Sequence, residues 1–295
     1  MQPKILQAAL LDLVRRTSCD LPEDAEKALA RALTREEKDT TARYALEVVR
    51  KNIAIAREKS LPICQDTGSI LFFVTGPKGL DQQAFRKAGD AAVKTATERG
   101  FLRQNSVDSL TGKNSGTNLG PGSPVYHFHQ WSRQSIEVNL ILKGGGCENM
   151  GIQYSLPNAA LGAGRDLAGV EKCILDAAFR AQGKGCAPGV LGVCVGGDRA
   201  TGYAHSKEQL LRPLDDKNPD PALGKLETRI LSKANELGIG PMGFGGHTTL
   251  FGCKIGALNR LPASYFVSVS YMCWAYRRRG CVLASTGKLS RWTYA

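Results

Sequence analysis

The sequence has no long apolar run and no secretory leader pattern, and each absence narrows the possible function. No window holds about 18 consecutive apolar residues, which excludes a transmembrane helix. The start, Met1-Gln2-Pro3-Lys4, lacks the charged segment and apolar core of a secretory signal. We therefore expect a cytoplasmic protein whose nine cysteines are free thiols and not disulfides.

Closely spaced cysteines and basic stripes are also missing. No two cysteines are spaced as Cys-x-x-Cys, which argues against a zinc ribbon or a thioredoxin-type site. Lysine and arginine number 39 against 27 aspartate and glutamate, a net charge of +12. Such a balance suits nucleic acid, anionic membranes or small anions, but no run alternates basic and aromatic residues as in single-strand binders. We expect a small anionic substrate, no nucleic acid and no membrane.

The periodic segments predict both helices and strands. Neither an internal repeat nor a low-complexity linker divides the chain. Helices come first and strands mixed with helices follow, which indicates an α+β fold with mixed β-sheets flanked by helices and a helical N-terminal region. We expect a single domain over residues 1–295. The predicted helices cover 5–16, 36–59, 82–98, 170–181 and 223–237, and the strands 70–74, 136–142, 190–195, 265–271 and 281–284.

Three cysteines differ from the other six in their sequence context. Cys64 lies in a Pro-to-Gly loop between a helix and a strand, Cys186 in a Gly/Pro loop before a strand, and Cys273 just after a strand. Metal ligands and catalytic groups are often held in such loops. Cys173 and Cys194 lie in apolar periodic stretches and are expected to be core residues. A lone intracellular cysteine is usually structural, and the long intervals between these three define no local metal motif.

Several segments resemble one family. Pro62-Ile63-Cys64-Gln65-Asp66-Thr67-Gly68 is similar to a motif characteristic of class I fumarases and L-tartrate dehydratases. The similarity extends from about residue 5 to about residue 285 and keeps the family's order and spacing. The chain therefore resembles the cluster-binding α subunit, or N-terminal half, of these iron-sulfur hydro-lyases. The other similar segments are Asn118-Leu119-Gly120, Lys143 to Gly146, Cys186-Ala187-Pro188, Leu237 to Pro241 and Cys273 to Arg278.

The resemblance implies a 4Fe-4S cluster held by Cys64, Cys186 and Cys273. Three protein ligands leave one of the four irons open, and an open iron is a Lewis acid that suits reversible addition of water to a carbon-carbon double bond. The resemblance also implies a small dicarboxylate substrate, with fumarate hydrated to (S)-malate as in the tricarboxylic acid cycle.

Four further residues correspond to functional positions of the family. Asp66 resembles the acid that protonates the departing hydroxyl, unless it only caps the Cys64 loop. Gln65 resembles a catalytic group that also hydrogen-bonds the substrate. Arg103 resembles an arginine that clamps a carboxylate with its fork of N–H donors, unless it is a plain surface residue. Gly146 resembles a backbone contact that a side chain would block.

The histidines give weaker signals. His127 and His129 lie on one face of a strand and could bind a metal, but the sequence offers no third ligand nearby. His247 lies in a glycine-rich loop where it could face the substrate. Many relatives have a histidine where this chain has Leu261, which cannot donate a proton. Either the enzyme does without that group, or His247 or a partner subunit replaces it.

The leading interpretation is the α subunit of a two-subunit class I fumarate hydratase. A β subunit would carry the catalytic base and further cations, and the assembly would be a homo- or hetero-oligomer. An L-tartrate dehydratase α subunit is the alternative within the family, and the segment 243–249 favours fumarase. A non-catalytic, cluster-binding sensory module is a third possibility: Leu261 favours it, whereas Gln65, Asp66 and Arg103 argue against it.

Overall fold

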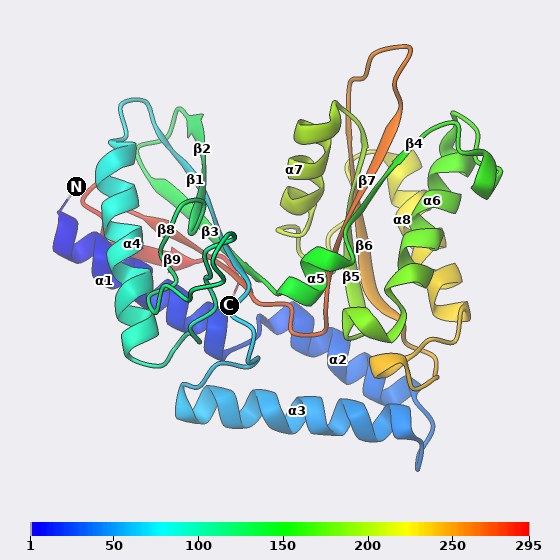
Figure 1. The fold of residues 1–295 in the computed structure, drawn as a ribbon, viewed down its shortest axis with the longest axis horizontal. Coiled ribbons are helices and arrows are strands. Elements are labelled where there is room, and N and C mark those ends of the chain that lie inside the picture. The colour runs from blue at the N-terminus through cyan, green and yellow to red at the C-terminus, as the bar shows by residue number, and fades with distance from the viewer. Residues whose placement is uncertain (1, 295) are drawn as a thin grey trace. The chain divides into compact units, whose positions relative to one another are not determined.

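The computed structural model describes residues 2–294, which form two compact units made of discontinuous segments. The first unit contains residues 2–23, 51–145 and 277–294, and the second contains residues 24–50 and 146–276. The α+β fold class and the helical N-terminal region are confirmed (Figure 1). The expectation of a single domain over 1–295 stays a prediction, since a division by contacts does not say whether the parts fold independently.

A five-stranded sheet forms the centre of the first unit, in the order β2-β1-β3-β8-β9. β1 pairs parallel with β2 and antiparallel with β3, and the pairs β3–β8 and β8–β9 are antiparallel. Helices α1 and α4 pack against each other beside this sheet (Figure 1). The bounds are α1 (Pro3–Cys19), β1 (Ser69–Pro77), α4 (Gln82–Glu98), β2 (Val125–Trp131), β3 (Ile136–Lys143), β8 (Arg278–Leu283) and β9 (Leu289–Trp292).

The core of the first unit follows from the apolar spacing in the sequence. On α1, Leu6, Leu10 and Leu13 recur at helical intervals and are almost fully buried. They belong to one hydrophobic cluster with Phe72 of β1 and Leu140 of β3. This core fixes β1, α4 and β3, and the loops that precede β1 and follow α4 carry the candidate site residues of the first unit.

The second unit has a four-stranded sheet in the order β4-β7-β5-β6. Helix α7 covers one face of this sheet, and α6 and α8 pack together on the other (Figure 1). Asp166, Asp198 and Asp220 cap the N-termini of α6, α7 and α8, respectively, by accepting backbone N–H groups. The bounds are α2 (Glu23–Arg35), α5 (Gly145–Asn149), β4 (Ile152–Ser155), η1 (Ala159–Leu161), α6 (Leu167–Ala181), η2 (Gln182–Gly185), β5 (Gly189–Gly196), α7 (Arg199–Gln209), α8 (Pro221–Glu236), η3 (Pro241–Gly243), β6 (Leu250–Leu258) and β7 (Phe266–Met272).

The helix predicted from residue 36 to 59 is wrong at its start. Helix α2 occupies Glu23–Arg35, and α3 (Thr41–Lys59) begins five residues later than expected. Asp39, between the two helices, has a φ of 63°, in the left-handed region that ends a right-handed helix. Helix α3 then contributes its first half to the second unit and its second half to the first.

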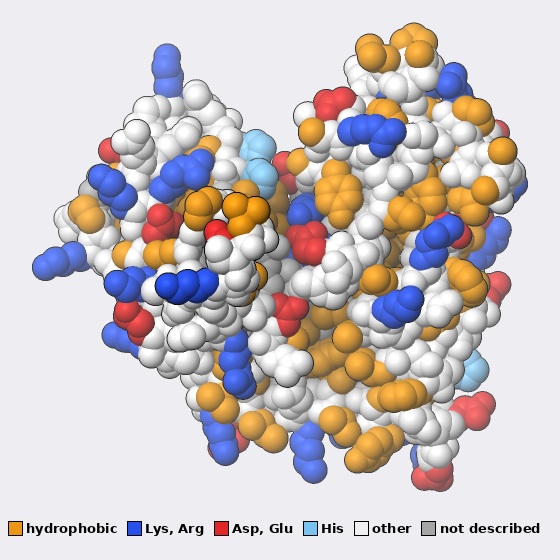
Figure 2. Space-filling model, in the orientation of Figure 1, with side chains coloured by type: hydrophobic (Ala, Val, Ile, Leu, Met, Phe, Trp, Pro, Cys, Tyr) orange, Lys and Arg blue, Asp and Glu red, His pale blue; other side chains and the backbone are white. Residues whose placement is uncertain are grey.

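On the face that Figure 2 draws, lysine and arginine side chains are scattered among acidic, apolar and neutral groups. Within residues 2–294, no helix is both long enough and apolar enough to cross a membrane.

A buried ion network stabilises the second unit. Lys254 of β6 is 4% exposed, and its Nζ donates to the Leu214 carbonyl and to Asp216 Oδ1. Arg212 donates to Asp216 and to Glu227 at 2.8 Å each. Burial tends to raise the pKa of Asp216, but the hydrogen bonds and charges of Arg212 and Lys254 outweigh burial and hold that pKa below its ordinary value.

Replacing Lys254 by methionine should lower the free energy of unfolding by about 2 kcal/mol at neutral pH, because it removes one of the two cations bonded to the half-buried Asp216 carboxylate. The lowered pKa of Asp216 means that the network stabilises the protein above the ordinary carboxyl pKa and loses this effect as the pH falls through the folded-state value. The difference between wild type and Lys254→Met should therefore narrow in acid. Urea unfolding across pH measures it, with exposed Lys225→Met as the control; equal losses in the two variants would contradict the prediction.

Candidate active site

The loop that carries Cys64 joins α3 to β1 and is fixed through Thr67. The Thr67 side chain is buried, and its Oγ1 donates to the Arg103 carbonyl at 2.8 Å and accepts the Arg103 N–H at 2.9 Å. This pair of bonds brings Arg103 next to the Cys64 loop although 36 residues separate Thr67 from Arg103. Four predicted site residues, Cys64, Gln65, Asp66 and Arg103, are thus held together in the first unit.

The Asp66 carboxylate is held at both oxygens. Oδ1 accepts a hydrogen bond from Asn105 Nδ2 at 2.5 Å, and Oδ2 accepts one from the Gly145 backbone N–H at 2.6 Å. The Asp66 N–H points to Cys64 Sγ at 3.4 Å. The carboxylate therefore bonds outside its own loop and does not cap it. An oriented carboxyl beside a free thiol is an arrangement that can transfer a proton.

Asn118 positions the segment that carries Arg103 and Asn105. It is 1% exposed and has a φ of 61°, a conformation that asparagine tolerates better than most residues. Its Oδ1 accepts the Asn105 N–H at 2.8 Å, and its Nδ2 donates to the Arg103 carbonyl at 2.8 Å. The Arg103 side chain is exposed and makes no ion pair or side-chain hydrogen bond among the residues that the structure describes. Its fork of donors is therefore available.

Two glycines let backbone segments meet beneath Asp66. Gly68 has a φ of 75°, and a Cβ there would overlap the Lys143 carbonyl. A Cβ on Gly144 would lie 3.1 Å from Asp66 Oδ2 and 3.7 Å from Arg277 Nη2. Position 68 therefore requires glycine, whereas Gly144 leaves the Asp66 carboxylate room that a side chain would make tight, and the Asp66 loop lies directly on the end of β3.

In the second unit, the chain brings Cys186 and Cys273 together. The Trp274 N–H, adjacent to Cys273, donates to the Cys186 carbonyl at 3.2 Å. Cys186 has a φ of 50° and a ψ of 60°, a left-handed conformation that a side chain disfavours. Costly conformations of this kind cluster at functional sites. Both thiols are free.

The buried Tyr271 ring packs against the loop that carries Cys186. A Cβ at Gly185 or at Gly189 would collide with its ring, so the Cys186 loop lies directly on the ring. Burial raises the pKa of the Tyr271 hydroxyl, and the nearby thiols of Cys273, Cys147 and Cys186 raise it further. These three sulfur groups therefore surround one buried ring.

Cys147 and Gly146 belong to the same part of the second unit. Gly146 is the second residue of α5, and a Cβ there would lie 3.9 Å from the Lys184 carbonyl in the Cys186 loop. Cys147 is 5% exposed and lies on α5. Glu148 fixes this short helix through an ion pair with Lys207 at 2.7 Å. Gly146 is thus placed beside the Cys186 loop, and Cys147 adds a third thiol that the sequence analysis did not single out.

His247 bonds to acidic residues of its own unit. Its backbone N–H donates to the buried Glu36 carboxylate, and its Nε2 lies 3.8 Å from Glu37 Oε1. The imidazole lines a cavity of about 450 Å³. Leu261 is 72% exposed, in a loop that Arg165 and Arg260 hold through carbonyl groups. Whether His247 compensates for Leu261 therefore stays a hypothesis.

His127 and His129 show no sign of a metal site. His127 stacks on Phe73 with ring centroids 4.7 Å apart. Across residues 2–294, no group of three or more His, Cys, Asp or Glu side chains lies together in a way that could hold a metal ion. Cys64 belongs to the first unit, and the Cys186–Cys273 pair belongs to the second.

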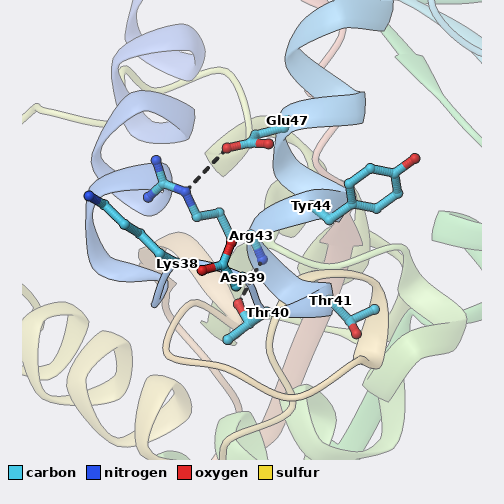
Figure 3. A pocket seen from close by; sticks show the side chains of 7 residues that line it. All are labelled: Lys38, Asp39, Thr40, Thr41, Arg43, Tyr44 and Glu47. Carbon is cyan, nitrogen blue, oxygen red and sulfur yellow. Dashed lines mark hydrogen bonds and ion pairs between the residues drawn. The ribbon is translucent and has the colours of Figure 1, made fainter.

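A surface hollow of about 640 Å³ at the start of α3 contains none of the predicted site residues (Figure 3). Its wall comes from one turn and the first part of one helix, and its single ion pair among the drawn residues joins Arg43 Nε to Glu47 Oε1 at 3.2 Å. A ligand site usually gathers polar groups from several elements. The candidate site therefore rests on the cysteine loops and not on this hollow, which is lined by Lys38, Asp39, Thr40, Thr41, Arg43, Tyr44 and Glu47.

Sequence reasoning missed Asn105, Asn118, Cys147 and Arg277 around these loops. Asn105 lies two residues after Arg103, and Cys147 follows Gly146, so proximity in sequence to predicted residues was the available signal. For Asn118 and Arg277, the similar family segments contained the residues but indicated no role.

Comparison with known proteins finds one matching family and several relatives. The family described as "Fumarate hydratase (Fumerase)" matches residues 7–282. A Geobacillus stearothermophilus protein, whose name places it with class I fumarate hydratases, is 51% identical over 293 residues, which is 98% of this chain and 57% of that protein. The chain thus spans little more than half the length of this relative.

Two further relatives have names that include L(+)-tartrate dehydratase subunit alpha. The Methanocaldococcus jannaschii protein is 33% identical over 274 residues, which is 91% of this chain and 94% of that protein. The Escherichia coli K12 protein is 31% identical over 234 residues, 77% of this chain and 74% of that protein.

Proposed function

The chain belongs to the fumarate hydratase (Fumerase) family, and from that premise we propose that it is the α subunit of an iron-sulfur hydro-lyase. With a separate β subunit it hydrates fumarate reversibly to (S)-malate. The observation that carries the proposal is the Asp66 carboxylate, which two hydrogen bonds orient beside Cys64 in the family's most characteristic motif. The whole chain acts as one cluster-binding domain over residues 1–295.

We propose that Cys64, Cys186 and Cys273 hold a 4Fe-4S cluster. The donor chemistry fits, because all three thiols are free and two of them are brought together around Tyr271. A cluster with three protein ligands supplies an open, Lewis-acidic iron when bound. The buried thiols of Cys173 and Cys194 are unsuited to this role, because burial raises their pKa to about 11 and about 12, which disfavours the thiolate.

In this proposal Asp66 gives a proton to the departing hydroxyl and takes it back in the hydration direction. The bonds from Asn105 and Gly145 fix the carboxyl oxygens, so the proton is held at a defined place. Orientation of this kind lowers the barrier because the group does not have to be ordered during the reaction.

Arg103, Gln65 and Gly146 bind the dicarboxylate. Thr67 and Asn118 fix the Arg103 backbone, while its guanidinium stays available for a two-pronged bond to a carboxylate. Gln65 is exposed in the same loop and offers both a donor and an acceptor. Gly146 lets the substrate approach the backbone closely.

A second candidate is the α subunit of an L-tartrate dehydratase. It is supported by the relative in Methanocaldococcus, because the chain covers 94% of that protein, whose name includes the tartrate dehydratase α subunit. A non-catalytic cluster protein is less well supported, since such a protein has no need of an oriented carboxyl and an available arginine. We also propose that the protein is cytoplasmic, that it acts in the tricarboxylic acid cycle and that it forms a homo- or hetero-oligomer.

The proposal is tested with anaerobically prepared complex of this chain and its β subunit. Hydration of fumarate should exceed dehydration of L-tartrate, and Asp66→Asn should lower kcat about 100-fold or more with unchanged iron content, because a carboxamide delivers no proton. Arg103→Lys should instead mainly raise KM, because an ammonium replaces a planar fork by a point charge. A faster reaction with tartrate would favour the second candidate. Wild-type turnover by Asp66→Asn would show that the acid lies elsewhere.

A further inference from the structure

Arg277 is a buried cation whose guanidinium has no partner among the residues that the structure describes. It is 1% exposed, yet its Nε and Nη1 have no hydrogen-bond partner among residues 2–294, and no ion pair reaches it in that part of the chain. A buried, unpaired charge is strongly unfavourable unless a nearby group of opposite charge offsets it. The residue therefore needs an explanation beyond packing.

The next two arginines of the same segment do have partners. Arg278 lies over the Tyr294 ring at 4.6 Å. Arg279 donates to the Tyr294 and Leu21 carbonyls at 2.8 and 3.0 Å and lies 3.3 Å from Asp20. The guanidinium groups of Arg278 and Arg279 thus contact Tyr294, Leu21 and Asp20 of the first unit. The Arg277 guanidinium makes no comparable contact among residues 2–294.

A backbone hydrogen bond places Arg277 near the Asp66 loop. Its carbonyl accepts the Leu142 N–H at 3.0 Å, which fixes Arg277 beside the end of β3, next to Lys143 and Gly144. Its Nη2 lies 3.7 Å from the place that a Cβ of Gly144 would take, and Asp66 Oδ2 lies 3.1 Å from the same place. The two opposite charges therefore share the space over Gly144 that a side chain would otherwise fill.

We infer that Arg277 is a positioning residue that holds the Asp66 carboxylate over Gly144 and against the Gly145 N–H. Because Arg277 is buried, water screens its charge less than it screens an exposed charge, so it can attract a carboxylate over several ångströms without direct contact. Since no hydrogen bond joins the two groups, Arg277 orients the carboxyl and leaves its oxygens free to exchange a proton. The inference rests on the proposed role of Asp66, but the orientation itself can be measured without activity.

Amide hydrogen exchange of Gly145 in the full chain is the direct test, because this N–H donates to Asp66 Oδ2. Asp66→Ala sets the rate expected when the bond is lost. Arg277→Gln should speed exchange at Gly145 about tenfold or more, whereas Arg277→Lys, which keeps the charge, should stay near wild type. Arg279→Gln is the matched control for loss of a buried arginine and should leave Gly145 unchanged. An unchanged Gly145 rate in Arg277→Gln would overturn the inference.

Kinetics of the complex with the β subunit give a second readout. Arg277→Gln should lower kcat per bound cluster about tenfold with little change in KM, and it should cause no further loss in an Asp66→Asn background, because both changes act through one group. Additive losses would overturn the inference. If Asp66→Asn alone keeps full turnover, the proposed acid is wrong, and Gly145 exchange still decides whether Arg277 holds Asp66. Failure of both Arg277→Gln and Arg277→Met to fold, with Arg277→Lys folded, would assign the charge to the fold and overturn the inference.

Discussion

Alanine at Cys64, Cys186 or Cys273 is expected to abolish the visible chromophore and to reduce bound iron to background in anaerobically reconstituted protein. Each change removes one of the three proposed thiolate ligands, and we expect a cluster with two protein ligands left to be lost. The structure supports the prediction for Cys186 and Cys273. The Cys186 loop packs on the Tyr271 ring, and the Trp274 N–H, next to Cys273, donates to the Cys186 carbonyl. Iron and sulfide per chain and the absorption spectrum measure the outcome.

Three other cysteines provide matched controls for this result. Cys173→Ala and Cys194→Ala remove buried thiols in α6 and β5 and should keep full iron. Cys147→Ala is the sharper control, because Cys147 lies beside the same tyrosine but is not proposed as a ligand. Full iron in Cys186→Ala would refute the ligand assignment, and loss of iron in Cys147→Ala would replace one of the proposed ligands by Cys147.

The isolated chain should bind the cluster but hydrate fumarate at least about 100-fold more slowly than the complex with its β subunit, since catalysis of this type depends on complete positioning of the substrate. The chain offers one oriented carboxyl and one available arginine, whereas a dicarboxylate also needs a base and a cation at its far end.

The measurement compares malate formation by equal amounts of cluster in the isolated chain and in the co-expressed complex. Titrating purified β subunit into the cluster-loaded chain should restore the rate and saturate at a fixed ratio, which separates a missing partner from a damaged cluster. Full activity of the isolated chain would contradict the two-subunit proposal.

Strong local patterns were predictable from sequence. Helix α4 was expected over 82–98 and forms over Gln82–Glu98, because apolar residues recur at helical spacing and Asp81 caps the start by accepting the Ala84 N–H. The strand expected over 136–142 is β3, which alternates clearly because one face is buried in the core. In both elements a single periodic face decides the structure.

Elements with weak or hidden patterns were missed. Helix α7 buries mainly Gly202, Ser206 and Gln209, so its packed face is small and polar and has no apolar period. Strand β6 contains the buried Lys254, which breaks its apolar run because the ion network that accommodates it comes from distant residues. Tertiary contacts decide such elements, and a single sequence does not display them.

The candidate site also has parts that could be predicted from the sequence and parts that could not. The Cys64–Thr67 loop could be read from its motif, because the functional groups lie within a few residues of each other. Arg277 and Asn118 act through bonds or charges to residues far away in the chain, so no spacing in the sequence signals them. Their roles depend on β3 and its neighbours meeting the Cys64 loop, which is a property of the folded sheet.

The order of strands in the first sheet has a consequence for synthesis on the ribosome. β8 is translated long after β3, yet it pairs with β3 inside the five-stranded sheet. Until it emerges, β3 has one unpaired edge in a strand that is almost entirely apolar or buried. Unpaired apolar edges promote aggregation in nascent chains. Chaperone binding to stalled nascent chains should therefore persist until residues 278–283 have left the exit tunnel, whereas the strands and helices of the second unit are all made before that point.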